Sequence, residues 1–126
     1  MRADIKLLIV DDERVIRQSV ADYFEDREWE VFTADSGEAG LAFLETQTCD
    51  AAIVDIRMGG MDGEAFIGKA ARKYPQMRFV VCTGSPEYLP SETIIGLPNV
   101  AGNVFSKPVT DLGLLETALL ALLEQQ

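Results

Sequence analysis

Five side chains that could carry chemistry stand at the ends of short, strand-like apolar runs: Asp11, Asp12, Asp55, Thr83 and Lys107. Each of them alone has an ordinary explanation, because acidic residues favour the N-terminal ends of helices and turns are rich in polar side chains. Their shared position is more informative. Parallel strands end at one common edge of a sheet, where the ligand sites of open α/β folds lie. The pattern therefore predicts one site that contains all of these residues.

The chemistry of these residues is complementary. Carboxylates that come from neighbouring strands repel one another unless a cation lies among them, and an all-oxygen ligand set favours Mg²⁺. Asp55 supplies a carboxylate nucleophile that can accept a phosphoryl group as an acyl phosphate. A cation held by Asp12 and Asp55 would neutralise the incoming phosphoryl oxygens. Lys107 would add a second positive charge and Thr83 a hydroxyl donor, so the residue types predict metal-dependent phosphoryl transfer to Asp55.

Strand-like and helix-like segments alternate through the chain and predict the elements that position these residues. Apolar runs predict strands over 5–10, 29–33, 51–54, 78–82 and 103–106. Apolar stripes at helical spacing predict helices over 15–24, 36–44, 63–74 and 112–122. The alternation predicts an α/β fold of the flavodoxin-like, doubly wound kind, with a parallel sheet in the order 2-1-3-4-5 and helices on both faces. We expect a single domain over residues 1–126.

The stretch between the fourth and fifth expected strands interrupts this pattern. It contains Pro86, Pro90 and Pro98 as well as Gly96. Only residues 91–95 remain free of proline and glycine, and so short a segment does not form a stable ordinary helix. We therefore expect the fourth helix to be short, shifted or irregular.

Composition excludes several classes of protein. The chain of 126 residues has no histidine, which excludes histidine-based zinc sites and Ser-His-Asp catalysis. Its net charge of −10 opposes direct binding of nucleic acid. The apolar runs are too short for a membrane span and the N-terminus lacks a signal-peptide pattern, so we expect a cytoplasmic protein. Cys49 and Cys82 are expected to be free cysteines in or near the core.

Four motifs give the chain a resemblance to a known family: LIVDDE at 8–13, VDIRMGGMDG at 54–63, VCTG at 81–84 and FSKP at 105–108. Together they resemble the receiver domain of two-component response regulators, and the resemblance covers essentially the whole chain. It implies a signalling switch rather than a classical enzyme. Asp55 would accept a phosphoryl group from a sensor histidine kinase or a phosphotransfer protein and would lose it slowly by autodephosphorylation.

The resemblance also implies roles for the residues around the acceptor. The implied ligands of Mg²⁺, or of Mn²⁺ in its place, are Asp11, Asp12, Asp55 and the backbone carbonyl of Arg57. Lys107 would pair with the acyl phosphate, Thr83 would move toward it, and the Lys107–Pro108 peptide bond would be cis.

An output surface is implied as well. Phosphorylation would shift the population of conformations of the face formed by the fourth helix, the fifth strand and the last helix. That face would then bind a partner or a second copy of the chain. Val104 stands where receivers usually carry Tyr or Phe, so we expect ordinary strand packing there and a weakened or absent threonine–aromatic coupling. Phe105 should point to the opposite face, and Gly59 in place of the usual proline should loosen the loop after the acceptor.

Three other classes of protein share parts of this pattern. Aspartate-dependent phosphatases usually carry a second carboxylate two residues after the nucleophile, where this chain has Arg57. A flavodoxin-like cofactor site would need a phosphate-binding loop after the first strand, where Asp11 and Asp12 would repel a phosphate. A receiver-like interaction module that is never phosphorylated remains the alternative, although the chain retains every residue that the chemistry needs.

Overall fold

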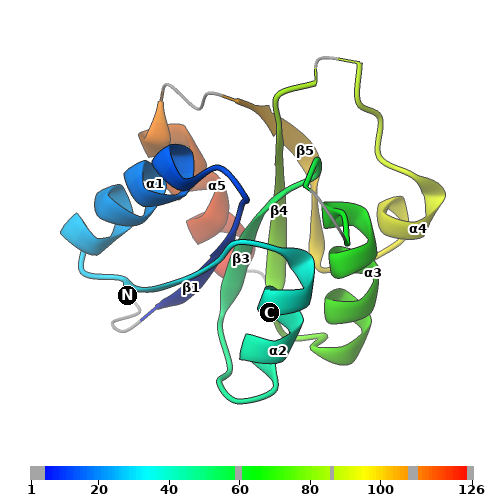
Figure 1. Ribbon diagram of the computed structural model, residues 1–126, viewed down its shortest axis with the longest axis horizontal. Coiled ribbons are helices and arrows are strands. Elements are labelled where there is room, and N and C mark those ends of the chain that lie inside the picture. The colour runs from blue at the N-terminus through cyan, green and yellow to red at the C-terminus, as the bar shows by residue number, and fades with distance from the viewer. Residues whose placement is uncertain (1–4, 59–60, 86, 108–110, 125–126) are drawn as a thin grey trace.

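Alternating strands and helices make up the computed structural model, which describes residues 5–58, 61–85, 87–107 and 111–124 (Figure 1). The elements in these ranges are β1 Lys6–Val10, α1 Arg14–Asp26, β2 Glu30–Ala34, α2 Gly37–Leu44, β3 Ala51–Asp55, α3 Gly63–Lys73, β4 Arg78–Thr83, α4 Glu92–Ile95, β5 Val100–Ser106 and α5 Leu112–Glu124. None of the helices in the described part of the chain is long and apolar enough to cross a membrane.

The strands form one sheet in the order β2-β1-β3-β4-β5. β1 lies between β2 and β3, with Val10 paired to Ala34 on one side and to Val54 on the other. Every pairing in the sheet is parallel, so the carboxyl ends of the strands meet at one edge. This arrangement confirms the fold predicted from the alternation of strands and helices.

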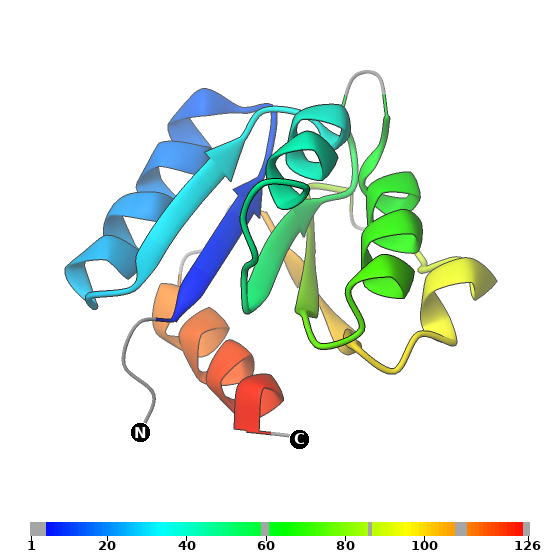
Figure 2. The same cartoon turned by 90° about the horizontal axis from the view of Figure 1, so that it is seen from below.

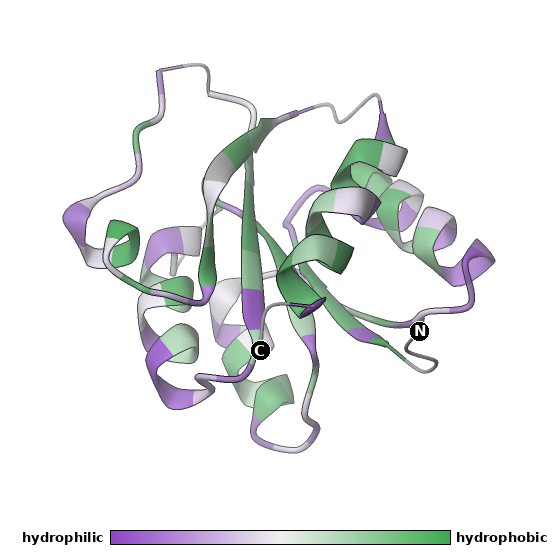
Figure 3. Cartoon of the chain, turned by 180° about the vertical axis from the view of Figure 1, so that it is seen from behind, coloured by the Kyte–Doolittle hydropathy of each residue, from purple (hydrophilic) through white to green (hydrophobic). Residues whose placement is uncertain are grey.

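Helices cover both faces of the sheet, α1 and α5 on one face and α2 and α3 on the other (Figures 1 and 2). Alternate residues of β1 serve the two faces. Leu8 and Val10 belong to the cluster under α2 and α3, whereas Leu7 and Ile9 belong to the cluster under α1 and α5. Hydrophobic residues accordingly run along most of the length of the central strands, and hydrophilic residues gather on loops and outer helix turns (Figure 3). Both faces of the sheet are thus buried, as expected for a parallel sheet.

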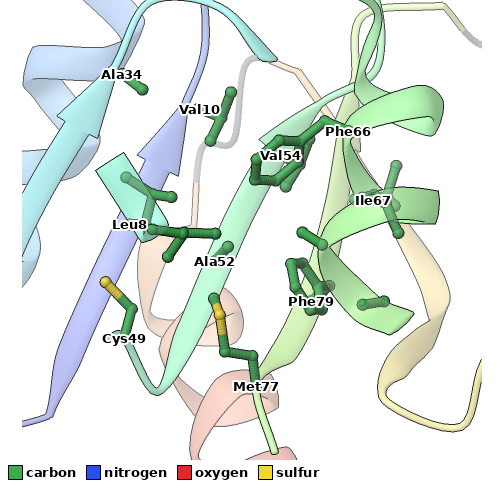
Figure 4. Packing of buried hydrophobic residues seen from close by; sticks show 14 of the residues in the cluster. Leu8, Val10, Ala34, Cys49, Ala52, Val54, Phe66, Ile67, Met77 and Phe79 are labelled. Carbon is green, nitrogen blue, oxygen red and sulfur yellow. The ribbon is translucent and has the colours of Figure 1, made fainter. Parts of the chain in front are cut away.

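The cluster under α2 and α3 fixes α3 beside the end of β3. Phe66 and Ile67 of α3 are buried in one cluster with the strand residues Val54 and Phe79, and Figure 4 shows the ring of Phe66 beside Val54. The rings of Phe66 and Phe79 meet edge to face, with their centroids 6.4 Å apart. Burial of each of these large side chains stabilises the fold by about 1.5–3 kcal/mol. The start of α3 is therefore held close to the carboxyl edge of the sheet.

The fourth helix is as short as predicted. α4 spans only Glu92–Ile95 and begins after Ser91, whose backbone carbonyl accepts hydrogen bonds from the amides of Ile94 and Ile95. Ile94 is its one buried side chain and packs in the cluster under α3. Prolines and a glycine on either side of this segment explain why the helix does not extend.

β5 begins at Val100, three residues before the strand predicted from 103. Asn99 causes this early start, because its buried side-chain amide donates to the backbone carbonyls of Ala71, at 3.1 Å, and Tyr74, at 3.4 Å. Its own carbonyl accepts from the amide of Phe79 at 2.9 Å. The chain is thus anchored to the end of α3 and enters the sheet directly afterwards. Gly102 in the following segment is not typical of a strand, which explains the misplaced boundary.

Both cysteines are free and buried, as predicted. Burial is the main cause that raises the pKa of Cys49 to about 11 and that of Cys82 to about 12. Thiols with such pKa values carry almost no thiolate at neutral pH, so both side chains act as small hydrophobic residues.

Candidate functional site

Two buried carboxylates face each other at the carboxyl edge of the sheet. Asp11 directly follows β1 and Asp55 is the last residue of β3, and these strands are neighbours in the sheet. Asp11 is 5% exposed and Asp55 is 3% exposed. Within the β1–α1 loop, Asp11 Oδ1 accepts from the amide of Glu13 at 2.8 Å, and the carbonyl of Asp11 accepts from the guanidinium of Arg17 at 2.7 Å. The sheet order thus brings together two residues that are far apart in sequence.

Lys107, which follows β5, reaches across to both carboxylates. Its Nζ lies 3.0 Å from Asp11 Oδ2, 3.2 Å from Asp55 Oδ2 and 2.8 Å from Glu13 Oε1. The backbone amide of Lys107 donates to the carbonyl of Thr83 at 2.8 Å, which fixes the start of the side chain beside β4. One ammonium group therefore holds three carboxylates, two from the β1–α1 loop and one from the end of β3.

The electrostatics of this cluster favour bound cations. The pKa of Asp55 is raised, first because the carboxyl is buried and second because of the charge of Asp11; Lys107 and the amide of Arg57 oppose the shift. Burial acts to lower the pKa of Lys107, but hydrogen bonds to Glu13 and Asp11 and the charges of Asp11 and Asp55 outweigh it and raise the pKa. Lys107 is consequently a permanent cation. The ionised form of Asp55 is disfavoured by its surroundings, and additional positive charge would stabilise it.

An acidic cluster at this edge offers the ligands that a divalent cation needs. One carboxylate oxygen from each of Asp11, Asp12, Glu13 and Asp55 lies within 4.8 Å of the others. Asp12 and Glu13 are exposed to solvent, while the other two are buried. An all-oxygen set with room for water on the exposed side fits Mg²⁺, which keeps several of its waters and takes few protein ligands. The residues present therefore fit the metal that the sequence predicted.

Glu13 had been given no role from sequence, although its carboxylate touches Lys107 and belongs to the acidic cluster. The signal was available, because Glu13 directly follows Asp11 and Asp12. It also occupies the N-cap position of α1, where its side chain makes no capping hydrogen bond but its negative charge is favoured by the helix dipole. That explanation concealed its second contact.

Thr83 and Arg57 border Asp55. Thr83 is the last residue of β4 and is buried, and its Oγ1 accepts from the amide of Ser85 at 3.1 Å. The amide of Arg57 lies 3.3 Å from Asp55 Oδ1, and its guanidinium extends to Ser85 Oγ at 3.4 Å. A hollow of about 380 Å³ opens here; its lining residues are Glu13, Asp55, Arg57, Gly84, Ser85, Glu87 and Lys107. The side chain of Asp55 is thus almost fully buried yet lines an accessible hollow.

Gly63 is a residue whose importance the sequence did not reveal. A Cβ at this position would lie 2.2 Å from the carbonyl oxygen of Asp55 and 2.7 Å from the Cα of Ile56. The amide of Gly63 donates to the carbonyl of Ile56 at 2.9 Å, and the preceding Asp62 caps α3 through the amide of Ala65. Only glycine lets α3 start this close to the end of β3 and the loop that follows it. The predicted cis bond at Lys107–Pro108 and the effect of Gly59 lie outside the described residues.

The doubly wound α/β sheet thus carries an acidic cluster and a lysine at its carboxyl edge, where the ligand sites of open α/β folds lie. Residues 7–119 match the response regulator receiver domain family. The chain belongs to this family, whose members are switches of two-component signalling rather than classical enzymes.

Solved structures and curated relatives agree with this assignment. A CheY-like response regulator receiver domain protein from Methanospirillum hungatei is 31% identical, with a TM-score of 0.81 and coverage of 98% of this chain and 97% of that one. The response regulator protein TrrA from Thermotoga maritima, solved in complex with Mg²⁺ and BeF, is 24% identical with a TM-score of 0.82 over 94% of this chain and 98% of that one, and shows the fold alone. The heme response regulator HssR from Staphylococcus epidermidis is 49% identical over 59 residues, or 47% of this chain. The matched part is about a quarter, 26%, of that relative's length.

Val104 packs as an ordinary strand residue. It lies against the cluster under α2 and α3, whereas Phe105 packs against the cluster under α1 and α5. The two neighbours thus point to opposite faces of the sheet, as strand geometry requires. Phe105 therefore cannot replace an aromatic ring at position 104.

Proposed function

We propose that Asp55 is the phosphoacceptor of this receiver domain. The observation that carries the proposal is the contact of Lys107 with the buried carboxylate at the floor of an open hollow. In the reaction, an oxygen of Asp55 bonds to the phosphorus of a phosphohistidine on a sensor histidine kinase or phosphotransfer protein. The bond from phosphorus to nitrogen breaks, and the released imidazole takes up a proton.

Asp11, Asp12, Asp55 and the backbone carbonyl of Arg57 would hold Mg²⁺, or Mn²⁺ in its place. When bound, the metal supplies positive charge that offsets the phosphoryl oxygens. Glu13 is close enough to the same ligand atoms to take part, directly or through water. The pKa of Asp55 is raised by burial and by the charge of Asp11, so a bound cation would stabilise its carboxylate form. This supports the assignment.

Lys107 and Thr83 act on the acyl phosphate from the chain itself. Lys107 exchanges one of its carboxylate contacts for a phosphoryl oxygen, to which it donates a charge-assisted hydrogen bond. Thr83 gives up its contact with the amide of Ser85 and turns its hydroxyl toward the same group. Both movements pull on the carboxyl ends of β4 and β5, and β5 is in contact with α4.

The output then follows as a shift of population at the face formed by α4, β5 and α5, which binds a partner or a second copy of the chain. Autodephosphorylation resets the switch slowly. We place the reaction in the cytoplasm, in a single domain over residues 1–126 that does not itself bind nucleic acid. The acidic balance of the chain, with a net charge of −10, supports the last point.

Intact-mass measurement after incubation with acetyl phosphate and Mg²⁺ tests the proposal. The wild-type chain is expected to gain one phosphoryl group, and both Asp55→Asn and a metal-free sample are expected to gain none. Asp35→Asn, which changes an exposed aspartate, is the matched control and should gain the group like the wild type. A wild-type chain that binds Mg²⁺ but gains no mass would support the phosphorylation-independent interaction module instead.

A further inference from the structure

A groove of about 590 Å³ lies beside the acceptor hollow. Its lining comes from four segments: Asp12 after β1, Ile56, Arg57 and Met58 after β3, Asp62 and Glu64 at the start of α3, and Tyr88, Leu89 and Ser91 before α4. Arg57 lines both the groove and the acceptor hollow, and Asp12 belongs to the acidic cluster. The groove is therefore contiguous with the site, yet most of its residues have no part in phosphoryl transfer.

Hydrogen bonds hold the far wall of the groove in place. Glu64 Oε2 accepts from the hydroxyl of Tyr88 and, at 3.0 Å, from the amide of Ser91. These contacts tie the long β4–α4 connection, which arches away from the sheet in Figure 1, to the first turn of α3. Burial acts to raise the pKa of Glu64, but the bonds from Tyr88 and Ser91 outweigh it and lower the pKa, so the carboxylate stays charged. The groove is thus preformed, which reduces the entropy cost of binding.

The charges of the groove select its occupant. Asp12, Asp62 and Glu64 supply three carboxylates against the single guanidinium of Arg57. The whole chain carries a net charge of −10, so these carboxylates disfavour a nucleic acid or another acidic surface in the groove. The negative charge of the groove instead favours a segment with basic side chains.

Apolar side chains at the rim make a second demand. Leu89 is 83% exposed and stands next to the half-buried Tyr88, and Met58 lines the same groove. A bulky apolar side chain of a partner would cover this surface. The volume of the groove is in the range of pockets that bury a small ligand or a few residues of a peptide.

We infer that this groove docks a short segment of a partner protein in which a lysine or arginine neighbours a bulky apolar side chain. The basic group lies among the carboxylates and the apolar group covers Leu89 and Met58. Because Asp12 and Arg57 also border the acceptor, docking here reports on the state of that site, and this coupling rests on the proposed function.

Titration of the ¹⁵N-labelled protein with short peptides tests the docking. The probe is an amidated peptide of alternating arginine and leucine, and its control carries glutamate in place of arginine. The basic peptide is expected to shift the amide resonances of Arg57, Met58, Tyr88 and Leu89, and the acidic peptide is expected to leave them unchanged. Leu89→Ser should weaken binding by about threefold or more, equivalent to about 0.65 kcal/mol or more.

Ile95→Ser is the matched control, since Ile95 is an exposed apolar residue, 67% exposed, that does not line the groove. Its binding is expected to equal that of the wild type. Shifts that map to α4 and α5 instead, equal shifts with the acidic peptide, or insensitivity to Leu89→Ser would overturn the inference. Concentration-dependent shifts of the groove residues without peptide would overturn it in favour of a second copy.

The titration needs no phosphoryl transfer, so it separates this inference from the proposed function. Binding to the unphosphorylated wild type tests the groove even if the mass measurement finds no phosphoryl group. Where phosphorylation does occur, the affinity for the basic peptide is expected to change on treatment with acetyl phosphate and Mg²⁺. An unchanged affinity in a fully phosphorylated sample would overturn the coupling, while a phosphorylated protein with no peptide binding would overturn the docking and leave the acceptor assignment intact.

Discussion

Two regions of the molecule are held together by different means. One is the acceptor edge, meaning the carboxyl edge of the sheet around the proposed acceptor Asp55, and the other is the fourth-helix region around α4. At the acceptor edge, Asp11, Asp55 and Lys107 extend from the ends of three parallel strands, and their contacts follow from the order of those strands. Around α4, two side chains hold backbone groups of distant segments: Glu64 binds the amide of Ser91, and Asn99 binds carbonyls at the end of α3. The first region is organised by the sheet, and the second depends on individual side chains.

Gly63→Ala is expected to have the largest effect, because it breaks the close approach on which the acceptor edge depends. The new Cβ would lie 2.2 Å from the carbonyl oxygen of Asp55, so α3 or the loop must move. We expect the free energy of unfolding to fall by about 3 kcal/mol. Urea denaturation measures the change. Gly84→Ala is the matched control, since a Cβ there meets no atom within 4 Å, and it should change stability by less than about 0.5 kcal/mol. Equal stability of the two variants would show that the start of α3 is adaptable.

Asn99→Ala tests the fourth-helix region in the same way. The variant removes a buried amide that donates to the carbonyls of Ala71 and Tyr74. We expect a loss of about 2 kcal/mol, because the buried carbonyl of Ala71 loses this donor and that of Tyr74 keeps only the amide of Met77. Gln76→Ala removes an exposed amide near the same helix end and should cost little. If Asn99→Ala unfolds at the same urea concentration as the wild type, the entry of β5 into the sheet does not depend on this side chain.

The sequence predicted the acceptor edge better than the region around α4. Apolar runs and the residues that follow them are local features, and the rules of parallel sheets then place Asp11, Asp55 and Lys107 together. The start of β5 at Val100 and the contact of Glu64 with the β4–α4 connection depend on side chains that meet across long separations in sequence. The importance of Gly63 is not visible in the sequence for the same reason, since nothing in the residues next to it in sequence shows that the carbonyl of Asp55 lies against it.

Asp55→Asn is expected to stabilise the protein in metal-free buffer. The pKa of Asp55 is raised by burial and by the charge of Asp11, so the carboxylate form disfavours folding at neutral pH. Lys107 keeps its contacts with Asp11 and Glu13 in the variant. We expect a gain of about 1 kcal/mol at pH 7, a common size for the removal of functional strain. Thermal unfolding measures it.

The sign of the pH dependence makes this prediction specific. An acid whose pKa is raised in the folded state binds more protons there, so its penalty is present at high pH and disappears as pH falls through the folded pKa. The gain from Asp55→Asn should therefore shrink toward acidic pH, and added Mg²⁺ should reduce it at neutral pH by stabilising the wild type. Asp35→Asn, at an exposed position, should show neither trend. A constant gain at every pH would point to packing rather than charge.

Glu64→Gln is expected to have the smallest effect and sharpens the contrast between the two regions. The variant keeps the shape of the side chain but removes the negative charge of the carboxylate whose oxygen accepts from Tyr88 and Ser91. We expect a loss of about 0.5 kcal/mol at pH 7, because the group is partly exposed to water. The pKa of Glu64 is lowered, so its contribution is complete above the ordinary carboxyl pKa and is lost as pH falls through the lowered value.

The pH dependence of Glu64→Gln is therefore opposite in sign to that of Asp55→Asn. The cost should vanish at acidic pH, where wild-type Glu64 is itself protonated, and Glu92→Gln at an exposed position of α4 should show no such change. Opposite trends follow from the physical difference between the two regions. Burial makes the charged form of Asp55 unfavourable for folding, whereas hydrogen bonds make the charged form of Glu64 favourable for folding. If both variants instead changed stability in the same direction with pH, the β4–α4 connection would not be held by the charge of Glu64.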